Sequence, residues 1–425
     1  MTIDHRREID APPQPEAERN SLSGSSALRR LYEIWTVSAK LGLTSFGGPI
    51  AHLGYFHEEY VKKRKWLDEK DYAELVALCQ FLPGPASSQV GIGIGLRRGG
   101  LAGAAAAWLG FTLPSAAVMV LFALALNGLD VSDAGWLHGL KLTAVAVVAQ
   151  AVWSMGRKLA AGPSRAAIAV FAAGLTLLLP GASGQVTAIA AAALAGLWLY
   201  RRHDADIAVP QVAPAPQPPL RRKAALLSLA LFFALLLLLP LFAAQSSGAG
   251  GTALRLFDSF FRAGSLVFGG GHVVLPLLQS EVVPSGLVGQ SDFLAGYGFV
   301  QAMPGPLFTF ASYLGAVMNG LPGAIIATLA IFLPAFLLII GVLPFWIWLC
   351  RNAKIQSALH GVNAAVVGIL LAALYDPIWT SSVLSAGDFM LALLLFAMLA
   401  WWKLPPWTTV LSGGAGGMLL SLVTG

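Results

Sequence analysis

Apolar stretches separated by short polar segments fill the chain from residue 28 onward. Many of them approach or exceed the about 20 residues that an α-helix needs to cross a bilayer. The expected spans lie at about 100–126, 135–156, 164–180, 184–200, 224–243, 320–347, 357–375, 388–402 and 406–424. Amphipathic helices are expected at 28–46, 66–82 and 254–268, and a further helical segment at 291–303. The pattern predicts an all-α polytopic membrane protein.

The order of these segments occurs twice, which predicts two repeats. Phe46 and Phe268 are 222 residues apart, and Pro83 and Pro304 are 221 apart. An ordered set of such matches is hard to obtain by chance. The predicted units are a disordered cytoplasmic tail (1–27), a first transporter repeat (28–200), a cytoplasmic linker (201–223), a connecting transmembrane helix (224–243) and a second transporter repeat (244–425).

The charged loops predict an orientation. Basic residues cluster in the N-terminal half at 62–65, 97–98 and in the 201–223 linker, whereas residues 127–134 form an acidic loop. Because Lys and Arg collect in cytoplasmic loops, the N-terminus is expected in the cytoplasm. The lone span 224–243 then carries the chain outward, so that the second repeat is inverted relative to the first. Such inverted-topology repeats are common in secondary transporters. They imply an odd number of crossings and a periplasmic C-terminus.

Each repeat contains the same two helix-breaking motifs in apolar surroundings. The first copy reads Phe46-Gly47-Gly48-Pro49 and Gln80-Phe81-Leu82-Pro83-Gly84-Pro85; the second reads Phe268-Gly269-Gly270-Gly271 and Gln301-Ala302-Met303-Pro304-Gly305-Pro306. Gly and Pro both interrupt helices. Inside a bilayer, broken or re-entrant helices persist only within protein or beside a wet cavity. Paired breaks in two halves indicate a transporter's binding site, although a packing kink is the simpler alternative.

A helix that begins at such a break offers unpaired N–H groups and the positive end of its dipole, which together bind oxyanions. We expect the backbone N–H groups at Gly84 and Gly305 to approach the anion, and nearby hydroxyl and amide groups to add hydrogen bonds. The candidate substrate-binding residues are Lys40, Gly47, Gly48, Gln80, Pro83, Gly84, Pro85, Ser87, Ser88, Arg262, Gly269, Gly270, His272, Gln301, Pro304, Gly305, Pro306 and Thr309.

Two cations and several titratable groups accompany these motifs. Lys40 and Arg262 each lie six residues before a Phe-Gly-Gly motif. A cation in an apolar span usually faces a cavity or a partner, but it can also snorkel to the interface. Matched acidic residues could pair with these cations or carry a coupling proton, and histidines could titrate near neutral pH or simply pack. The proton-coupling candidates are Glu59, Glu281, His138 and His360.

Composition excludes several other classes of protein. The 425-residue chain is 56% hydrophobic and only 11% charged, whereas soluble domains carry about 25% charge. Its net charge of +6 is expected to report orientation rather than binding to nucleic acid. Cys79 and Cys350 match no metal or disulfide framework, and no ATP-binding Gly-x4-Gly-Lys-Ser/Thr loop is present. We therefore expect no metal, no cofactor and no enzymatic activity.

The two pairs of motifs, together with Trp66 before the first Pro-Gly-Pro and His272 after the second Gly triplet, resemble the chromate ion transporter family in its long, two-domain form. The resemblance covers roughly residues 30–424. It implies a carrier in the bacterial inner membrane that expels chromate, driven by the proton-motive force, and thereby confers chromate resistance. The second copy departs from the first, since Gly271 replaces Pro49 and the basic run 62–65 is missing. A symmetric site is therefore not implied.

Other functions fit the same motifs. Chromate is a tetrahedral dianion much like sulfate, so a sulfate or related oxyanion carrier is an alternative. A passive anion channel is another, because broken helices also form selectivity filters. A chromate reductase would need a flavin, haem or metal signature, and the sequence has none. The expected partners are chromate, with sulfate as a competitor, protons and the lipid bilayer, and a homodimer is left open.

Overall fold

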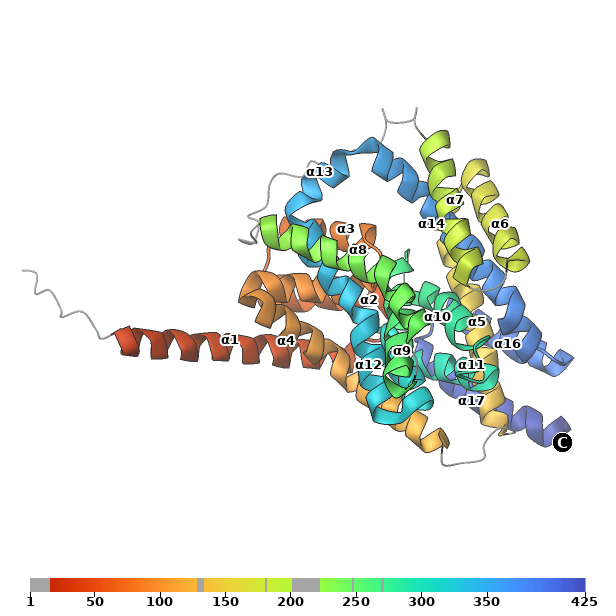
Figure 1. Cartoon of the computed structure of the whole chain (residues 1–425). Helices are drawn as coiled ribbons and strands as arrows, with labels where there is room; N and C mark the ends of the chain where they lie inside the picture. The colour runs from red at the N-terminus through yellow and green to blue at the C-terminus, as the bar shows by residue number, and fades with distance from the viewer. Residues whose placement is uncertain are drawn as a thin grey trace, which may run out of the picture.

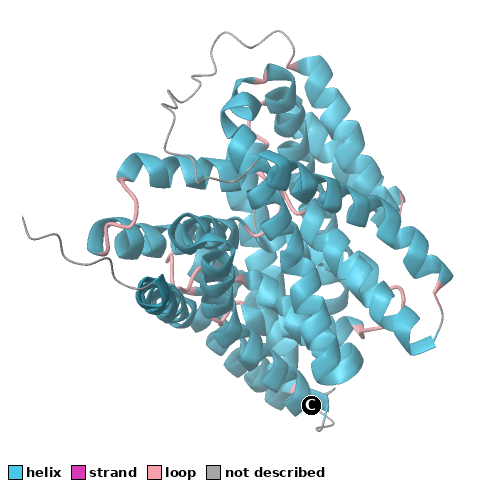
Figure 2. Cartoon of the chain, turned by 60° about the vertical axis from the view of Figure 1, so that its left-hand side comes forward, coloured by secondary structure: helices cyan, strands magenta, loops and turns pink. Residues whose placement is uncertain are grey.

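The computed structural model describes residues 16–127, 134–179, 182–200, 222–246, 248–268 and 271–424. Within these ranges every regular element is a helix and no strand occurs, which confirms the all-α prediction (Figures 1 and 2). Five helical segments are long and apolar enough to cross a membrane. They are Ala86–Leu126, Gly135–Leu159, Arg222–Gln245, Leu307–Phe345 and Ala353–Ser382. The chain is therefore built as a polytopic membrane protein.

The helices of the first half follow the expected order. They are α1 (Glu16–Thr44), α2 (Gly48–Phe56), the π-helix η1 (His57–Lys63), α3 (Glu69–Phe81), α4 (Ala86–Asn127), α5 (Gly135–Leu159), α6 (Pro163–Leu178) and α7 (Ala182–Leu199). Helix α1 begins at Glu16, so residues 16–27, which were expected to be disordered, are helical. Helix α2 was not predicted from the sequence. Residues 1–15, the acidic residues 130 and 133, and the linker residues 201–221 lie outside the described ranges.

The second half repeats this order after a connecting helix. Its elements are α8 (Arg222–Gln245), α9 (Gly248–Leu266), η2 (Gly271–Val273), α10 (Val274–Val282), α11 (Gln290–Val300), η3 (Leu307–Thr309), α12 (Phe310–Val342), η4 (Leu343–Phe345), α13 (Trp346–Arg351), α14 (Ala353–Ala373), η5 (Leu374–Trp379), α15 (Thr380–Ser382), α16 (Ala386–Ala400) and α17 (Pro406–Thr424). Helix α8 matches the expected connecting span, and α9 to α17 match α1 to α7 in order.

The long helices α4 and α12 are each interrupted at matched positions. Gly100 has φ +64° and ψ −154°, and Gly320 has φ +57° and ψ −150°. The chain folds back at both points, which brings the backbones on either side of the interruption together. A Cβ on Gly95 would lie 2.3 Å from the carbonyl oxygen of Gly103, and a Cβ on Gly315 would lie 2.3 Å from that of Gly323. Such contact between backbones is open only to glycine. The first part of each long helix is thus a separate short segment.

These short segments form two hairpins with the Pro-Gly-Pro turns at their tips. The first hairpin joins α3 to residues 86–98 of α4, and the second joins α11 to residues 310–318 of α12. Helix α3 has 13 residues and α11 has 11. At 1.5 Å per residue these helices are at most about 20 Å long, less than the about 30 Å core of a bilayer. The helices of the hairpins are therefore too short to span the bilayer, as in re-entrant loops.

The two repeats are intertwined. Helix α5 of the first repeat packs on α16 and α17 of the second, and α14 of the second repeat packs on α6 and α7 of the first (Figure 1). Gly139 meets the backbone of Gly413, and Gly361 meets that of Ala192. The matched His138-Gly139 and His360-Gly361 pairs thus mark two equivalent helix crossings, in which glycine lets the backbones touch. The main hydrophobic core contains residues of both repeats.

Candidate functional site

Each Pro-Gly-Pro tip is hydrogen-bonded to the broken helix of the opposite repeat. The N–H of Gly84 donates to the carbonyl oxygen of Val267 at 2.7 Å, and the N–H of Gly305 donates to that of Ser45 at 2.9 Å. Ser45 and Val267 directly precede the two Phe-Gly-Gly motifs. The amide groups of Gly84 and Gly305, which we expected to face an anion, are therefore used to join the repeats.

Local chemistry explains why the tips fold in this way. Leu82 ends α3 in an extended conformation before Pro83, as the residue before a proline favours. Gly84 and Gly305 have φ +115° and +88°, which side chains rarely adopt. The amide of Gln89 donates to the carbonyl oxygen of Pro83 at 2.8 Å. On the second tip the hydroxyl of Thr309 donates to the carbonyl oxygen of Pro306 at 2.9 Å, so it is engaged locally.

A cavity of about 220 Å³ lies where the first Gly-Gly break meets the second Pro-Gly-Pro tip. It therefore brings together candidate residues from both repeats. Its lining residues are Gly47, Gly48, Val147, Gln150, Gln301, Met303, Gly305, Leu307, Leu399, Lys403, Leu404 and Pro406. Gly47, Gly48, Gln301 and Gly305 were expected at the site, whereas Gln150 and Lys403 were missed. Nothing in their sequence surroundings distinguishes these two residues from ordinary helix-surface and loop residues.

The break at Gly47 and Gly48 places a helix N-terminus at this cavity. Both glycines have positive φ, +95° and +77°, and Pro49 occupies the first turn of α2. Gly47 makes no side-chain cap, and α2 runs directly into η1. The first N–H groups of a helix have no partner within it, and the dipole places partial positive charge there. This arrangement suits an anion in the cavity.

Two side chains add to this positive character. The side chain of Gln301 is buried, and its amide lies beside the hydroxyl of Tyr297. Lys403, in the turn between α16 and α17, has no ion-pair partner in the part of the chain that the structure describes. Its φ of +52° is unusual for a residue with a side chain. A buried amide, an exposed lysine and a helix N-terminus without a side-chain cap form a site that can hold an oxyanion.

A second group of buried polar side chains lies beside the first tip. The Oγ of Ser87 is 3.3 Å from the Nδ1 of His52. The Oγ atoms of Ser45 and Ser88 and the Nε2 of His52 have no partner among the described residues. The imidazole of His52 also lies within hydrogen-bonding reach of the backbone of Ser45, so this cluster links the first tip to the end of α1.

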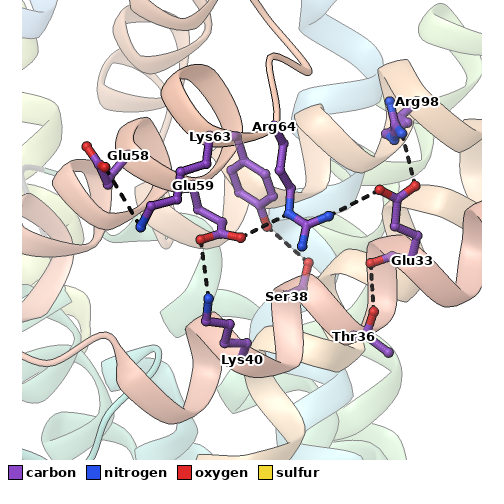
Figure 3. Close-up of polar contacts among 10 residues, drawn as sticks. Glu33, Thr36, Ser38, Lys40, Glu58, Glu59, Lys63, Arg64 and Arg98 are labelled. Atoms are coloured by element: carbon purple, nitrogen blue, oxygen red, sulfur yellow. Dashed lines mark hydrogen bonds and ion pairs between the residues drawn. The ribbon is translucent and has the colours of Figure 1, made fainter.

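Lys40 belongs to a chain of ion pairs instead of the cavity (Figure 3). Its Nζ lies 3.5 Å from Oε2 of Glu59, and the other oxygen of this carboxylate, Oε1, accepts a 2.9 Å hydrogen bond from Nε of Arg64. Arg64 and Arg98 both contact Glu33, at 3.2 and 3.0 Å. Burial alone would raise the pKa of Glu59, but the hydrogen bond from Arg64 and the charge of Lys40 hold that pKa below its ordinary value. Glu59 is therefore a poor proton carrier near neutral pH.

Arg262, the counterpart of Lys40 in the second repeat, has more acidic neighbours than Lys40 has. The Nη2 of Arg262 lies 2.9 Å from Oδ2 of Asp258 and 2.9 Å from Oε2 of Glu281. Two carboxylates thus share one guanidinium, whereas Glu59 contacts two cations, Lys40 and Arg64, the second of which it shares with Glu33. The side chains of Asp258 and Glu281 are 6% and 12% exposed. Both expected pairings, Lys40 with Glu59 and Arg262 with Glu281, are therefore present.

The remaining candidates are spread over the molecule. The Nε2 of His138 lies 2.7 Å from Oδ1 of Asp388, which caps α16, and His360 lies edge-on to Tyr200. Gln80 is exposed at the end of α3. The backbone of Gly269 and Gly270 and the side chain of His272 lie outside what the structure describes. Among the described residues, no group of His, Cys, Asp and Glu could hold a metal ion.

Comparison with known proteins gives a consistent result. The family described as "Chromate transporter" matches this chain twice, at residues 32–197 and 254–418. A probable chromate transport protein of Synechococcus elongatus is 28% identical over 369 residues, 86% of this chain and 88% of the relative. The chromate transport protein of Pseudomonas aeruginosa is 27% identical over 90% of both chains. That of Cupriavidus metallidurans is 24% identical over 96% of this chain and 97% of its own. No solved structure matches.

Proposed function

The chain belongs to the chromate transporter family, whose members are membrane transport proteins and not enzymes. We propose that it exports chromate from the cytoplasm in exchange for protons. Export of this kind confers chromate resistance. The observation that carries the proposal is the cavity between the two repeats, because it joins a free helix N-terminus, a buried amide and an unpaired cation. These are the groups that bind a tetrahedral dianion.

The chemistry of the cavity accounts for binding without a metal or cofactor. Helix N–H groups at Gly48 and beyond direct partial positive charge at the anion. Lys403 supplies a full charge, and Gln301 donates through Nε2. Charge-assisted hydrogen bonds are roughly twice as strong as neutral ones, so the lysine is the main contributor. Each of these groups contributes only one or a few hydrogen bonds to the anion. Such moderate binding suits a transported ion, which must also be released from the site.

The transport mechanism proposed is alternating access between two inverted repeats. Its support is the reciprocal pair of hydrogen bonds, Gly84 to Val267 and Gly305 to Ser45, in which each tip makes the same contact with the opposite repeat. In such folds one repeat rocks against the other around a central site. The orientation expected from basic loops places the N-terminus and Lys403 in the cytoplasm and the C-terminus in the periplasm. The inner membrane of a bacterium is the proposed location.

Proton coupling is assigned to Asp258 and Glu281. Two buried carboxylates around the single guanidinium of Arg262 carry a net negative charge, which one proton neutralises. Like charges that share a site favour protonation of one member. Glu59 has the opposite balance, with Lys40 and Arg64 beside it. The second repeat thus carries the proton in this proposal, and the first repeat carries a permanent ion pair.

A sulfate or related oxyanion carrier is the second candidate function. The observation that favours it is that the cavity groups recognise charge and hydrogen-bond acceptors, which sulfate and chromate share. Nothing in the lining depends on the chromium atom. Sulfate is therefore expected to compete, whichever anion is carried.

The test is uptake of radiolabelled chromate into inverted membrane vesicles. We expect saturable uptake that an imposed pH gradient accelerates, that excess sulfate reduces, and that Lys403→Gln abolishes at normal protein levels. Uptake that does not saturate and ignores the pH gradient would identify a passive channel. Sulfate uptake without chromate uptake would establish the sulfate carrier instead.

A further inference from the structure

A second basic pocket lies away from the cavity, beside the interruption of α4. Its volume is about 470 Å³. It is formed by α1, the residues between η1 and α3, and the end of the first segment of α4. The lining residues are Arg30, Trp66, Leu67, Ile94, Arg97 and Arg98. Three guanidinium groups face one pocket, and none of its lining residues is acidic.

The guanidinium groups of this pocket are held in place but retain free donors. The guanidinium carbon of Arg98 lies 4.2 Å from the centre of the Trp66 ring, and its Nη2 is 3.0 Å from Oε2 of Glu33. Arg97 makes a longer contact, 3.5 Å, with Asp71. The Nε atoms of Arg97 and Arg98 are buried and have no partner among the described residues. Since arginine has five N–H donors, most remain available.

The acidic neighbours of the pocket lie outside its lining. Glu33 is shared between Arg98 and Arg64, whereas Asp71 and Glu74 lie near Arg97. Arg30 is exposed and has no ion-pair partner among the described residues. The lining itself, with three arginines and no acidic residue, presents positive charge to an anion. Arginine suits this role because its planar fork matches two oxygens of a tetrahedral oxyanion.

The second repeat shows that the fold does not require these arginines. Its residues in the places of Arg97 and Arg98 are Val317 and Met318, followed by the same interruption at Gly320. A basic pair at the end of this helix segment is thus an addition to the first repeat. Asp71 and Glu33 each pair with one of these guanidinium groups, but the buried Nε atoms of Arg97 and Arg98 have no partner among the described residues. A bound anion would complete their hydrogen bonding.

We propose that this pocket is a second oxyanion site, distinct from the cavity at Lys403, which binds a tetrahedral anion through Arg30, Arg97 and Arg98. The anion is either the free dianion that the protein carries or the phosphate of an anionic lipid headgroup. In the first case the proposal rests on the proposed function, and the site concentrates the dianion at the cytoplasmic face by attraction to its positive charge. In the second case the site anchors the protein to a particular lipid.

The test uses full-length protein in which Lys403→Gln removes binding at the cavity. Sulfate binding is measured by titration calorimetry in detergent. The pocket is then altered by Arg97→Val with Arg98→Met, the residues that the second repeat already tolerates. A separate Arg30→Gln variant is paired with Arg29→Gln as control, because Arg29 is equally exposed but does not line the pocket. A parallel series measures thermal unfolding in nanodiscs of phosphatidylcholine, with and without phosphatidic acid.

For the free dianion, we expect sulfate affinity to fall at least about tenfold in the double variant and in Arg30→Gln, and to stay unchanged in Arg29→Gln. If the ligand is a lipid headgroup, we expect these substitutions to leave sulfate affinity unchanged. Phosphatidic acid should then raise the melting temperature of the parent protein but not that of the double variant. The proposal is overturned if neither sulfate binding nor phosphatidic acid stabilisation depends on the pocket arginines in folded variants. Chromate flux that survives Lys403→Gln would instead refute the cavity, and leave the sulfate result at the arginine pocket to stand by itself.

Discussion

Replacing Lys403 with glycine separates the function of this residue from its effect on folding. Lys403 has φ +52°, a conformation that costs a residue with a side chain about 1–2 kcal/mol and glycine nothing. Glycine loses about 0.5–1 kcal/mol more backbone entropy than alanine on folding, which offsets part of the gain. Lys403→Gly should therefore leave the protein as stable as the wild type or more stable by about 0.5–1 kcal/mol.

The same substitution should weaken chromate binding. A hydrogen bond to a charged group contributes about 1.5–3 kcal/mol, so its loss corresponds to a roughly ten- to hundredfold lower affinity. A variant that is at least as stable but does not bind is hard to explain by damage to the fold. The assay is thermal unfolding of the purified protein, together with the shift that increasing chromate produces.

Lys65 provides a matched control. It is the other lysine with φ +52°, and its counterpart in the second repeat, Gly286, has φ +71°. Lys65→Gly removes the same charge and the same backbone strain, but it does not touch the cavity. Chromate should stabilise Lys65→Gly as it does the wild type. The reasoning is refuted if chromate stabilises Lys403→Gly to the same extent as Lys65→Gly.

Three further predictions test the tips, the proton site and the topology. Gly305→Ala should destabilise the protein more than Gly84→Ala. A Cβ at Gly305 would lie 2.8 Å from Ser115 Oγ and 3.2 Å from two backbone oxygens, whereas a Cβ at Gly84 would meet first, at 3.1 Å, the side chain of Gln89. Equal melting temperatures of the two variants would contradict this prediction. Glu281→Gln should abolish the acceleration of chromate uptake by a pH gradient, whereas Glu59→Gln should preserve it, and the reverse pattern in vesicles would exclude our assignment. A cysteine placed at residue 210 should resist an impermeant reagent added to intact cells, and labelling there would show that the linker is not cytoplasmic.

The sequence was sufficient to predict the breaks and their duplication. Proline and glycine act locally, so Pro83-Gly84-Pro85 and its copy predict turns whatever surrounds them. The start of α3 is equally local, since Asp68 caps this helix by accepting a hydrogen bond from the N–H of Asp71. The apolar stretches likewise predicted most helices within a few residues. The expected spans at 164–180, 184–200 and 388–402, however, form shorter apolar helices than a membrane span requires.

What the sequence could not provide were contacts between distant segments. The partner of the Gly84 N–H is Val267, 183 residues away, and no local pattern points to it. Lys403 lines the same cavity as Gly48 and Gln301 because α16 and α17 pack against α5 of the other repeat. For Lys40, the sequence offered both an ion pair with Glu59 and a place at the substrate. The structure shows the ion pair, since the two side chains meet across different helices.

The central claim is that the anion binds where the first Gly-Gly break meets the second Pro-Gly-Pro tip. The most direct measurement is anomalous X-ray diffraction at the chromium absorption edge, from crystals of the protein grown with chromate. The account predicts an anomalous peak in the cavity, within hydrogen-bonding distance of Gln301 and the ammonium group of Lys403. Full occupancy by chromate elsewhere, with no peak between these residues, would contradict it.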